Sequence, residues 1–462
     1  MINFKIYAFM KKVLLLISFV FLLILAGCTN SSTTVTLSNV ARVTAFGFYA
    51  NDSFPGLAKA KFTVEELTDT GLIAVVDSVM YGTPLDSVNP KVAFYTTPAA
   101  AILHLGKDNE QKYLSGNGLD TVDFTKSPAL LEVYSQDKST IKWYRIKVYA
   151  HTVDPDLFHW NRLTPAVCPA VPAEQKAVKM GDTFCFYTNN GFTNKLYMSQ
   201  DAVQWTEKQV TGALPADCHV SGIVSDGQKL YYCDSNAVYQ STDGITWQQM
   251  RDCSSDRYVP VTFVMHFNGL LWGIVRDANR VHQLATLNPD GEFVVQDVFD
   301  EGYIPSNFPI SDFAVVQFTS ASSHRHILIA GGYNYDGEML NSRWSVEYNQ
   351  VRQEYRMVNY ATEQTGTAPL AGLALAWYGN RLYAFGGLTE NGFYPDNIRV
   401  SDDEGLHWVA ADTAHNILPA TFGKRQRVTA ITDGDFIYLF GGQSATQTYT
   451  DVYCGKMNSI NW

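Results

Sequence analysis

Three loops of this sequence carry side chains that could contact a ligand. In the printed sequence they follow Gly-Gly pairs, and they combine aromatic rings with carboxylate and amide groups. Aromatic faces beside such polar groups suit sugar rings, and they also serve as anchors for protein partners. The structural alternative is that the rings only cover neighbouring loops. The candidate ligand-binding residues are Tyr333, Tyr335, Asp336, Asn391, Phe393, Tyr394 and Tyr449.

Two closely spaced histidines could form a metal site. His324 and His326 alternate, so in a strand both imidazoles lie on one face, as a metal site requires. No third ligand stands at a diagnostic spacing, and the alternative is a strand end with two solvated histidines. The expectation is therefore no metal site and no cofactor.

The elements that position these side chains repeat along the chain. Each Gly-Gly pair ends an apolar strand, and the pairs Gly331-Gly332, Gly386-Gly387 and Gly441-Gly442 are separated by two intervals of 55 residues. In two of the three repeats a polar turn and an earlier apolar strand precede the pair, which is typical of a β-hairpin.

A second repeated element is a tight turn rich in Ser, Asp and Gly that precedes an aromatic residue. Ser and Asp oxygens can accept hydrogen bonds from nearby backbone amides, and the aromatic ring can pack under the turn. We expect these residues to be structural. They are Asp201 with Trp205, Asp243 with Trp247, Asp403 with Trp408, and in degenerate form Trp462.

Together these elements predict four short strands in each unit of about 40 to 60 residues, which describes a propeller blade. Six units occur, at about 174–210, 216–252, 259–298, 311–358, 369–411 and 425–462. The last unit is short of one strand, and residues 158–163 are expected to pair beside it and close the ring. Residues 156–462 are therefore predicted to form a six-bladed β-propeller.

The preceding segment lacks the repeat. Residues 35–155 contain short alternating strands separated by turn residues, which indicates an antiparallel, immunoglobulin-like β-sandwich. The whole chain is thus expected to be all-β.

These motifs carry a resemblance. The Gly-Gly strands resemble kelch repeats, and the Ser-x-Asp-x-Gly-x-x-Trp turns resemble the Asp-boxes of sialidase-type propellers. With the N-terminal features described below, the combination resembles a group of Bacteroidales surface lipoproteins of unknown function. The resemblance is specific for fold and nearly silent on activity.

A sialidase-like enzyme would need an arginine cluster, a Tyr nucleophile with its Glu, and an Asp acid. The Arg-Ile-Pro signature of that family is absent, and the sequence cannot show whether Arg343, Arg381, Arg399, Arg425 and Arg427 converge. A mutarotase needs only one or two acid/base groups, which no linear motif reveals. Three or more charged side chains meeting at the central funnel would favour an enzyme, whereas a shallow aromatic rim would favour a binding protein.

The first 28 residues predict the cellular location of the protein. Lysines precede an apolar run that ends in Leu-Ala-Gly-Cys, which resembles a bacterial lipobox. Residues 1–27 are expected to be a lipoprotein signal peptide, with Cys28 lipidated and residues 28–34 a flexible tether. Thr29 follows the cysteine rather than Asp, which favours the outer membrane and the cell surface, with the periplasmic face as the alternative.

Charge and cysteines narrow the functional classes. The net charge of −11 becomes −14 without residues 1–27, and no basic cluster lies beyond them, so nucleic acid is not an expected partner. The six remaining cysteines fit no compact disulfide framework and are expected to be free and buried.

The leading hypothesis is a monomeric surface lipoprotein, not an enzyme, that binds a glycan or a protein through one propeller face and contacts the membrane only through the lipid on Cys28. The rivals are a propeller enzyme acting on sugars, sialic-acid mutarotase-like or a glycosidase, and a structural subunit of an outer-membrane complex.

Overall fold

The computed structural model describes residues 36–458 except 52–53, 77, 117–119, 321–323, 350, 362–367 and 395. The predicted signal peptide, Cys28, nearly all of the tether and Trp462 lie outside the described residues. The chain divides into two compact units on either side of the Asp154–Pro155 bond. The described residues contain strands and two short 3-10 helices, and none of their helices is long and apolar enough to span a membrane.

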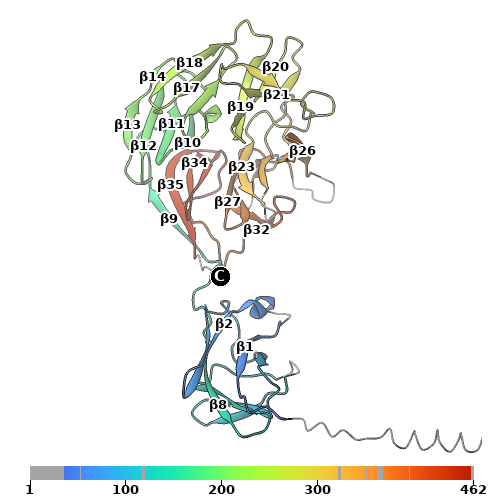
Figure 1. Ribbon diagram of the computed structural model, residues 1–462. Coiled ribbons are helices and arrows are strands. Elements are labelled where there is room, and N and C mark those ends of the chain that lie inside the picture. The colour runs from blue at the N-terminus through green and yellow to red at the C-terminus, as the bar shows by residue number, and fades with distance from the viewer. Residues whose placement is uncertain are drawn as a thin grey trace, which may run out of the picture. The chain divides into compact units, whose positions relative to one another are not determined.

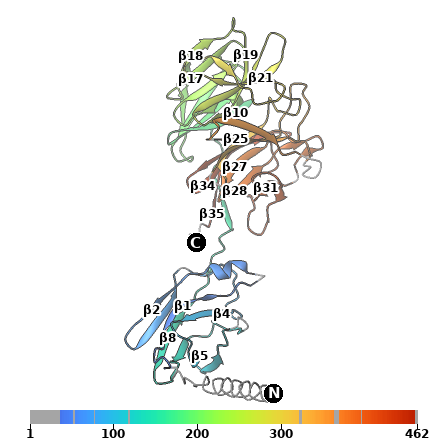
Figure 2. The ribbon, with the colours of Figure 1, turned by 45° about the vertical axis from the view of Figure 1, so that its right-hand side comes forward.

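The first unit packs a two-stranded sheet against a six-stranded sheet (Figure 2). The Val43 amide donates to the Tyr144 hydroxyl over 3.0 Å and joins the two sheets through the core. The smaller sheet is β1 (Val43–Phe48) with β4 (Pro90–Phe94), and η1 (Pro55–Lys59) follows β1. The larger sheet, in spatial order, is β2 (Phe62–Glu65), β3 (Thr70–Val75), β8 (Ile141–Lys147), β7 (Ala129–Tyr134), β5 (Ala100–Leu105) and β6 (Glu110–Tyr113).

One pair in this unit departs from the expected antiparallel pattern. β3 and β8 run parallel, with Ile73 opposite Ile146. A parallel and an antiparallel neighbour present the same alternation of side chains, so the sequence pattern carries no information on strand direction. The unit has two packed sheets, as expected, and the purely antiparallel expectation is wrong at this pair.

In the described part of the second unit, six sheets each form a blade, and the small two-stranded sheet in the blade 5 loop is additional to them. The first strands of neighbouring blades contact one another all round the ring, so the propeller closes on itself. The expectation of an all-β chain with a six-bladed propeller is confirmed.

In chain order, the first three blades are as follows. Blade 1 is β10 (Glu174–Met180), β11 (Thr183–Asn189), β12 (Asn194–Ser199) and β13 (Thr206–Gln209). Blade 2 is β15 (Val224–Ser225), β16 (Leu230–Cys233), β17 (Ala237–Ser241) and β18 (Thr246–Asp252), with β14 (Thr211–Gly212) at its outer edge and η2 (Val220–Gly222) before β15. Blade 3 is β19 (Val259–Phe267), β20 (Leu270–Arg276), β21 (His282–Leu287) and β22 (Phe293–Val295).

The remaining three blades contain the Gly-Gly pairs. Blade 4 is β23 (Ala314–Thr319), β24 (Arg325–Ala330), β25 (Arg343–Asn349) and β26 (Glu354–Asn359). Blade 5 is β27 (Ala374–Tyr378), β28 (Arg381–Phe385), β31 (Ile398–Ser401) and β32 (Val409–Ala410), with the hairpin β29 (Leu388–Thr389) and β30 (Gly392–Phe393) in its loop. Blade 6 is β33 (Thr429–Asp433), β34 (Phe436–Gln443), β35 (Thr448–Met457) and β9 (Phe158–Thr164).

Ring closure depends on β9, which precedes the other blade strands in sequence and occupies the outer position of blade 6. Figure 1 shows β9 alongside β35, although their colours mark opposite ends of the propeller sequence. Asn161 pairs with Cys454 in this register. Pairing of residues 158–163 beside the last blade is therefore confirmed.

Two of the Gly-Gly pairs hold their blades to the next one through backbone hydrogen bonds, and at the third the Gln175 side chain of blade 1 donates to the Gly442 carbonyl. Gly386 and Gly387 have φ of 60° and 112°, and the Gly387 amide donates to the Arg425 carbonyl oxygen at the entry to blade 6 over 3.0 Å. A Cβ on Gly386 would lie 2.3 Å from that same oxygen. Gly332 makes the equivalent bond to Leu370. Only glycine combines this backbone conformation with so close an approach.

The Asp turns are closed by side-chain hydrogen bonds. Asp201 accepts from the amides of Val203 and Gln204 at 2.9 and 2.8 Å, and the Trp205 indole donates to Ala202. The turns at Asp243 and Asp403 make the same kind of Asp–amide bond, and Trp247 and Trp408 follow them. Asp201, Asp243 and Asp403 thus fix the third-to-fourth strand turns of their blades.

Buried arginines stiffen the Gly-Gly blades. The fully buried Arg425 donates to Asp451 over 2.7 Å and to the Gly441 carbonyl over 3.0 Å. Its guanidinium lies between the rings of Phe422 and Tyr449. In blade 5 the buried Arg399 donates to the Gly386 carbonyl beneath the Tyr394 ring.

The six cysteines of the described region are all free and buried, as expected. Burial raises the pKa of Cys185 and Cys218 to about 12, so both are held as thiols at neutral pH. The six are Cys168, Cys185, Cys218, Cys233, Cys253 and Cys454.

Candidate functional site

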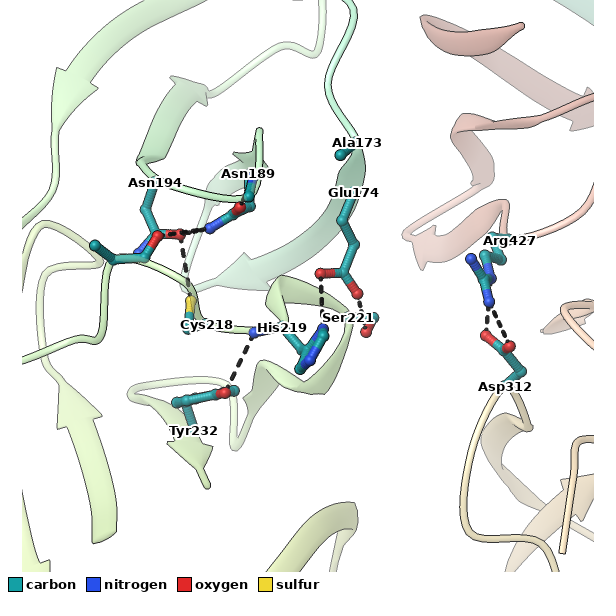
Figure 3. Close-up of polar contacts among 12 residues, drawn as sticks. Ala173, Glu174, Asn189, Asn194, Cys218, His219, Ser221, Tyr232, Asp312 and Arg427 are labelled. Atoms are coloured by element: carbon teal, nitrogen blue, oxygen red, sulfur yellow. Dashed lines mark hydrogen bonds and ion pairs between the residues drawn. The ribbon is translucent and has the colours of Figure 1, made fainter. Parts of the chain in front are cut away.

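The site lies where the first strands of the blades begin, on the propeller face that also carries the Gly-Gly loops. Loop residues and strand entries touch there: Tyr333 bridges to Ser311, and the Gln443 side chain donates to the Ala173 carbonyl. Charged and polar side chains from blades 1, 2, 4 and 6 lie at these entries. Figure 3 shows two groups of them, Glu174 with His219 and Ser221, and Asp312 with Arg427. We call Glu174, Lys176, His219, Ser221, Asp312 and Arg427 the axial cluster.

Arg427 and Asp312 form one half of the axial cluster. The Arg427 Nε and Nη2 atoms donate to the two carboxylate oxygens of Asp312 over 2.9 and 2.6 Å. This fork joins blade 6 to blade 4 and holds both groups in one plane. The Arg427 side chain keeps 47% of its surface exposed, so the pair is reachable from solvent.

The backbone at this pair is strained. Asp312 and Arg427 stand two residues before the first strands of their blades, with φ of 49° and 55°. In blade 5 the equivalent position is Gly372, with φ of 64°. Its amide donates to the Asp312 carbonyl, and its carbonyl accepts from the Arg427 amide. Blades 4 and 6 therefore hold an aspartate and an arginine in a conformation that suits glycine, which marks these positions as functional candidates.

The charges of the axial cluster affect the pKa values of Arg427 and Lys176. The hydrogen-bonded Asp312 carboxylate raises the pKa of Arg427, and Glu174 and Tyr333 contribute in the same direction. Burial lowers the pKa of the Lys176 ammonium, and the charges of Glu174 and Asp312 partly oppose this. Arg427 and Lys176 thus lie within electrostatic range of the Glu174 and Asp312 carboxylates.

Glu174 forms the other half of the axial cluster. Its carboxylate accepts from the Ser221 hydroxyl over 2.5 Å, and its Oε2 lies 3.5 Å from His219 Nδ1. His219 is 86% exposed while Glu174 is 25% exposed, so the imidazole is the solvent-facing member (Figure 3). A carboxylate that orients an exposed imidazole can support proton transfer.

The short helix η2 supplies Ser221 and follows directly after His219. Hydrogen bonds fix the segment just before this helix. The His219 amide donates to the Tyr232 hydroxyl over 3.2 Å, and the Cys218 thiol donates to Asn194 over 3.4 Å. Asn189 also donates to the Ala216 carbonyl over 2.9 Å. Asn189 and Asn194 at the adjoining ends of β11 and β12, together with Tyr232 on β16, therefore hold the segment that carries His219 and Ser221 (Figure 3).

The structure separates the aromatic candidates into groups. Tyr394 and Tyr449 cover the buried Arg399 and Arg425 at 3.9 and 3.8 Å, so their faces are already occupied by guanidinium groups. Tyr333 is half-buried and lies within electrostatic range of Arg427. Tyr394 and Tyr449 thus have a packing role, and Tyr333 borders the axial cluster.

The remaining loop candidates lie farther out on the loops. Tyr335 stacks on the His282 ring of blade 3 at 5.5 Å and remains 42% exposed. Asp336 and Asn391 are exposed, and Phe393 is half-buried on β30. Within the described part of the chain, no hydrogen bond, ion pair or ring contact joins these residues to the axial cluster.

Several residues on this face were not predicted from the sequence. Asp312 could be found by aligning the repeats, because it precedes an apolar strand by the same two residues as Gly372 and Arg427. Phe192, which is 81% exposed, follows Asn-Gly in the blade 1 loop as Phe393 does in the blade 5 loop. Glu174, His219 and Ser221 carry no linear signal.

Comparison with known proteins bears on the family. The model described as the DUF6242 beta propeller domain matches residues 154–462, and the domain of unknown function (DUF6242) N-terminal domain matches residues 31–148. No curated protein matches the chain. The solved structure titled "Structure of YjhT" is similar to it at 13% identity and a TM-score of 0.46, over 63% of this chain and 96% of that chain.

Proposed function

This chain belongs to the DUF6242 family, and on that premise we propose that it is a saccharide-binding lipoprotein whose ligand enters the axial cluster of the propeller. The observation that carries the proposal is the strained pair Asp312–Arg427. Blades 4 and 6 have an aspartate and an arginine at the position where blade 5 has glycine, and the Arg427 side chain of this pair is exposed to solvent. Glycine would adopt this backbone conformation with less strain at either position, but it would remove the solvent-exposed ion pair.

The chemistry of the cluster favours a polar ligand without a large net charge. Two carboxylates, a guanidinium, an ammonium, a hydroxyl and an imidazole offer both donors and acceptors at short range, as vicinal sugar hydroxyls require. Because the site contains both cationic and anionic groups, a strongly charged ligand would be attracted by some of them and repelled by others. The Tyr333 ring at the border supplies an apolar face.

The arginines argue against a sialidase-type clamp. Arg399 and Arg425 lie inside their blades, bonded to backbone carbonyls, and Arg343 is likewise buried and donates to the Leu406 carbonyl. Arg381 begins β28 and pairs with Asp156 and Asp402. Of the five arginines considered from sequence, Arg427 alone belongs to the axial cluster, so a glycosidase that grips a carboxylate with three arginines is not proposed.

A second function has an observation of its own. The exposed His219 beside Glu174, with Lys176 on the same strand, provides acid/base groups at a saccharide site. Sugar mutarotation needs only a proton donor and a proton acceptor. Four charged side chains within electrostatic range of one another support this alternative. We therefore propose mutarotation of a bound sugar as the alternative to binding alone.

Binding is tested with a glycan array and the variant Arg427→Gly. This change relieves the positive φ and should leave the propeller folded while removing the guanidinium, so we expect saccharide binding to fall by at least about 10-fold. Asn380→Gly is the matched control, because Asn380 also has a positive φ of 61° but lies in the β27–β28 turn. Equal binding by Arg427→Gly and Asn380→Gly would overturn the axial-cluster proposal.

Two further variants separate the alternatives. Tyr335→Ala should leave binding intact if the ligand lies at the axial cluster, and should abolish it if the outer aromatic loops are the site. Glu174→Gln should reduce the rate of anomer exchange, measured by NMR on sugars that bind, only if the protein is an enzyme. A wild-type protein that neither binds any saccharide nor accelerates anomer exchange would contradict both functions.

The cellular setting belongs to the same proposal. The lipobox-like Leu-Ala-Gly-Cys supports a lipid on Cys28 and an outer-membrane location, and the unit before Asp154 would then serve as a spacer between lipid and propeller. The protein is proposed to act as a monomer at the cell surface.

A further inference from the structure

A second polar cluster lies on blade 4, at the end of β24 away from Gly331. One ring nitrogen of His324, one ring nitrogen of His326 and one carboxylate oxygen of Glu347 lie within 4.8 Å of one another. His326 is directly opposite Glu347 in the β24–β25 pairing, and His324 is two residues before it on the same face. Glu347 is the third ligand that sequence spacing alone could not identify.

We propose that His324, His326 and Glu347 bind one Zn²⁺ ion. Two imidazoles and one carboxylate are an established zinc donor set that leaves a position for water. Nitrogen donors distinguish the site from oxygen-only sites that suit Mg²⁺ or Ca²⁺. The site lies at the opposite end of blade 4 from the axial cluster, so it is independent of the proposed saccharide function.

His326 is the fixed member of the site. It is 8% exposed, and its ring stacks on Phe318 at 5.4 Å, while Phe318 stacks on Trp377 at 4.9 Å. Its buried Nδ1 atom has no hydrogen-bond partner among the described residues. An imidazole that is already ordered loses little conformational freedom when it binds a metal.

The other two ligands are exposed side chains. His324 and Glu347 are 58% and 39% exposed, and their nearest polar atoms, Nδ1 and Oε1, are 3.8 Å apart. Ligand atoms at about 2.0 to 2.1 Å from a tetrahedral zinc ion are about 3.3 Å from one another. Small rotations of two exposed side chains therefore bring all three atoms to the required separation.

One cation faces the site. Arg356 on β26 is directly opposite Glu347, and it is exposed. Within the described region no ion pair joins Arg356 to Glu347, whose carboxylate instead faces His324. The positive charge opposes metal binding, so Arg356→Gln is expected to strengthen zinc binding by a few fold.

The test is a Zn²⁺ titration of purified protein that carries no polyhistidine tag and has been treated with a chelator. Calorimetry should show one saturable zinc ion per chain, and Glu347→Gln and His326→Asn should each bind at least about 100-fold more weakly, since even outer-shell losses cost 10- to 100-fold. His407→Ala is the control, because His407 forms a surface pair with Asp403 at 2.6 Å that could bind zinc adventitiously.

Loss of zinc binding in His407→Ala, or wild-type affinity in Glu347→Gln, would overturn the proposal, as would the absence of saturable binding by the wild type. Because replacing the stacked His326 can disturb the blade, Glu347→Gln carries the decision if His326→Asn fails to fold. The melting temperature gives a second readout: zinc should raise it in wild type and not in Glu347→Gln.

Discussion

The joint between blades 5 and 6 offers the sharpest test of how the ring is held together. Gly386→Ala adds one methyl group at a residue with φ of 60°, placed 2.3 Å from the Arg425 carbonyl oxygen. A left-handed backbone costs alanine about 1 to 2 kcal/mol relative to glycine. Displacing the carbonyl adds about 1 to 3 kcal/mol of overpacking, and weakening the Gly387–Arg425 hydrogen bond adds about 1 kcal/mol.

A matched control separates the contact from the backbone strain. Gly434→Ala has almost the same φ, 55°, but its Cβ would meet no atom within 4 Å. It should therefore show only the backbone cost of about 1 to 2 kcal/mol. Gly386→Ala is expected to lose about 2 to 4 kcal/mol more than the control, which corresponds to a melting temperature lower by about 3 to 6 °C.

The measurement is thermal and urea denaturation followed by tryptophan fluorescence, with wild type, Gly386→Ala and Gly434→Ala side by side. Similar unfolding midpoints for the two variants would refute the reasoning, because the carbonyl contact would then contribute nothing beyond the φ effect. Destabilisation of Gly386→Ala alone would assign the effect to the joint between blades.

Three further predictions use the same assays or simple fractionation. Asp451→Asn leaves Arg425 as a buried charge without its carboxylate and should lower the free energy of unfolding by about 3 to 5 kcal/mol, whereas the exposed Asp435→Asn should change it by less than about 1 kcal/mol. Hydrogen bonds from the Gln204 and Val203 amides lower the pKa of Asp201 from its ordinary 3.8, so its ionised form stabilises the fold above about pH 4 and this contribution is lost as the pH falls through the lowered pKa. The melting temperature of wild type should accordingly exceed that of Asp201→Asn at pH 7, and the difference should shrink in acid; a constant difference would contradict the assignment. Cys28→Ser should move the protein from the membrane fraction to the soluble fraction, and continued membrane retention would contradict the lipid anchor.

The propeller was predictable because its determinants are local. Gly-Gly pairs at equal intervals and Asp turns before Trp each act within a few residues, so a single sequence shows them directly. Their contacts bear this out at Asp201, whose carboxylate bonds amides two and three positions along the chain. Strand direction is not local, which is why the parallel pair β3–β8 was not predicted.

The candidate site was much less predictable because distance in sequence separates its parts. Asp312 and Arg427 are 115 residues apart, and Glu174 and Ser221 are 47 residues apart. Neither spacing repeats or forms a motif. The aromatic loops were conspicuous in the sequence, yet Tyr394 and Tyr449 contact buried arginines that only the folded blades bring beneath them.

The pairing of β9 with β35 in blade 6 has a consequence for folding. Arg162 on β9 pairs with Asp451 across 289 residues, so the last blade is completed by a strand that is synthesised before all the other propeller strands. Closing so long a loop is slow, and it cannot occur until almost the entire propeller has been made. An array of blades that could otherwise fray from either end thus becomes a cycle with no terminal blade. The propeller should unfold as one cooperative body, and a single cut in an exposed loop should leave the severed chain held in place.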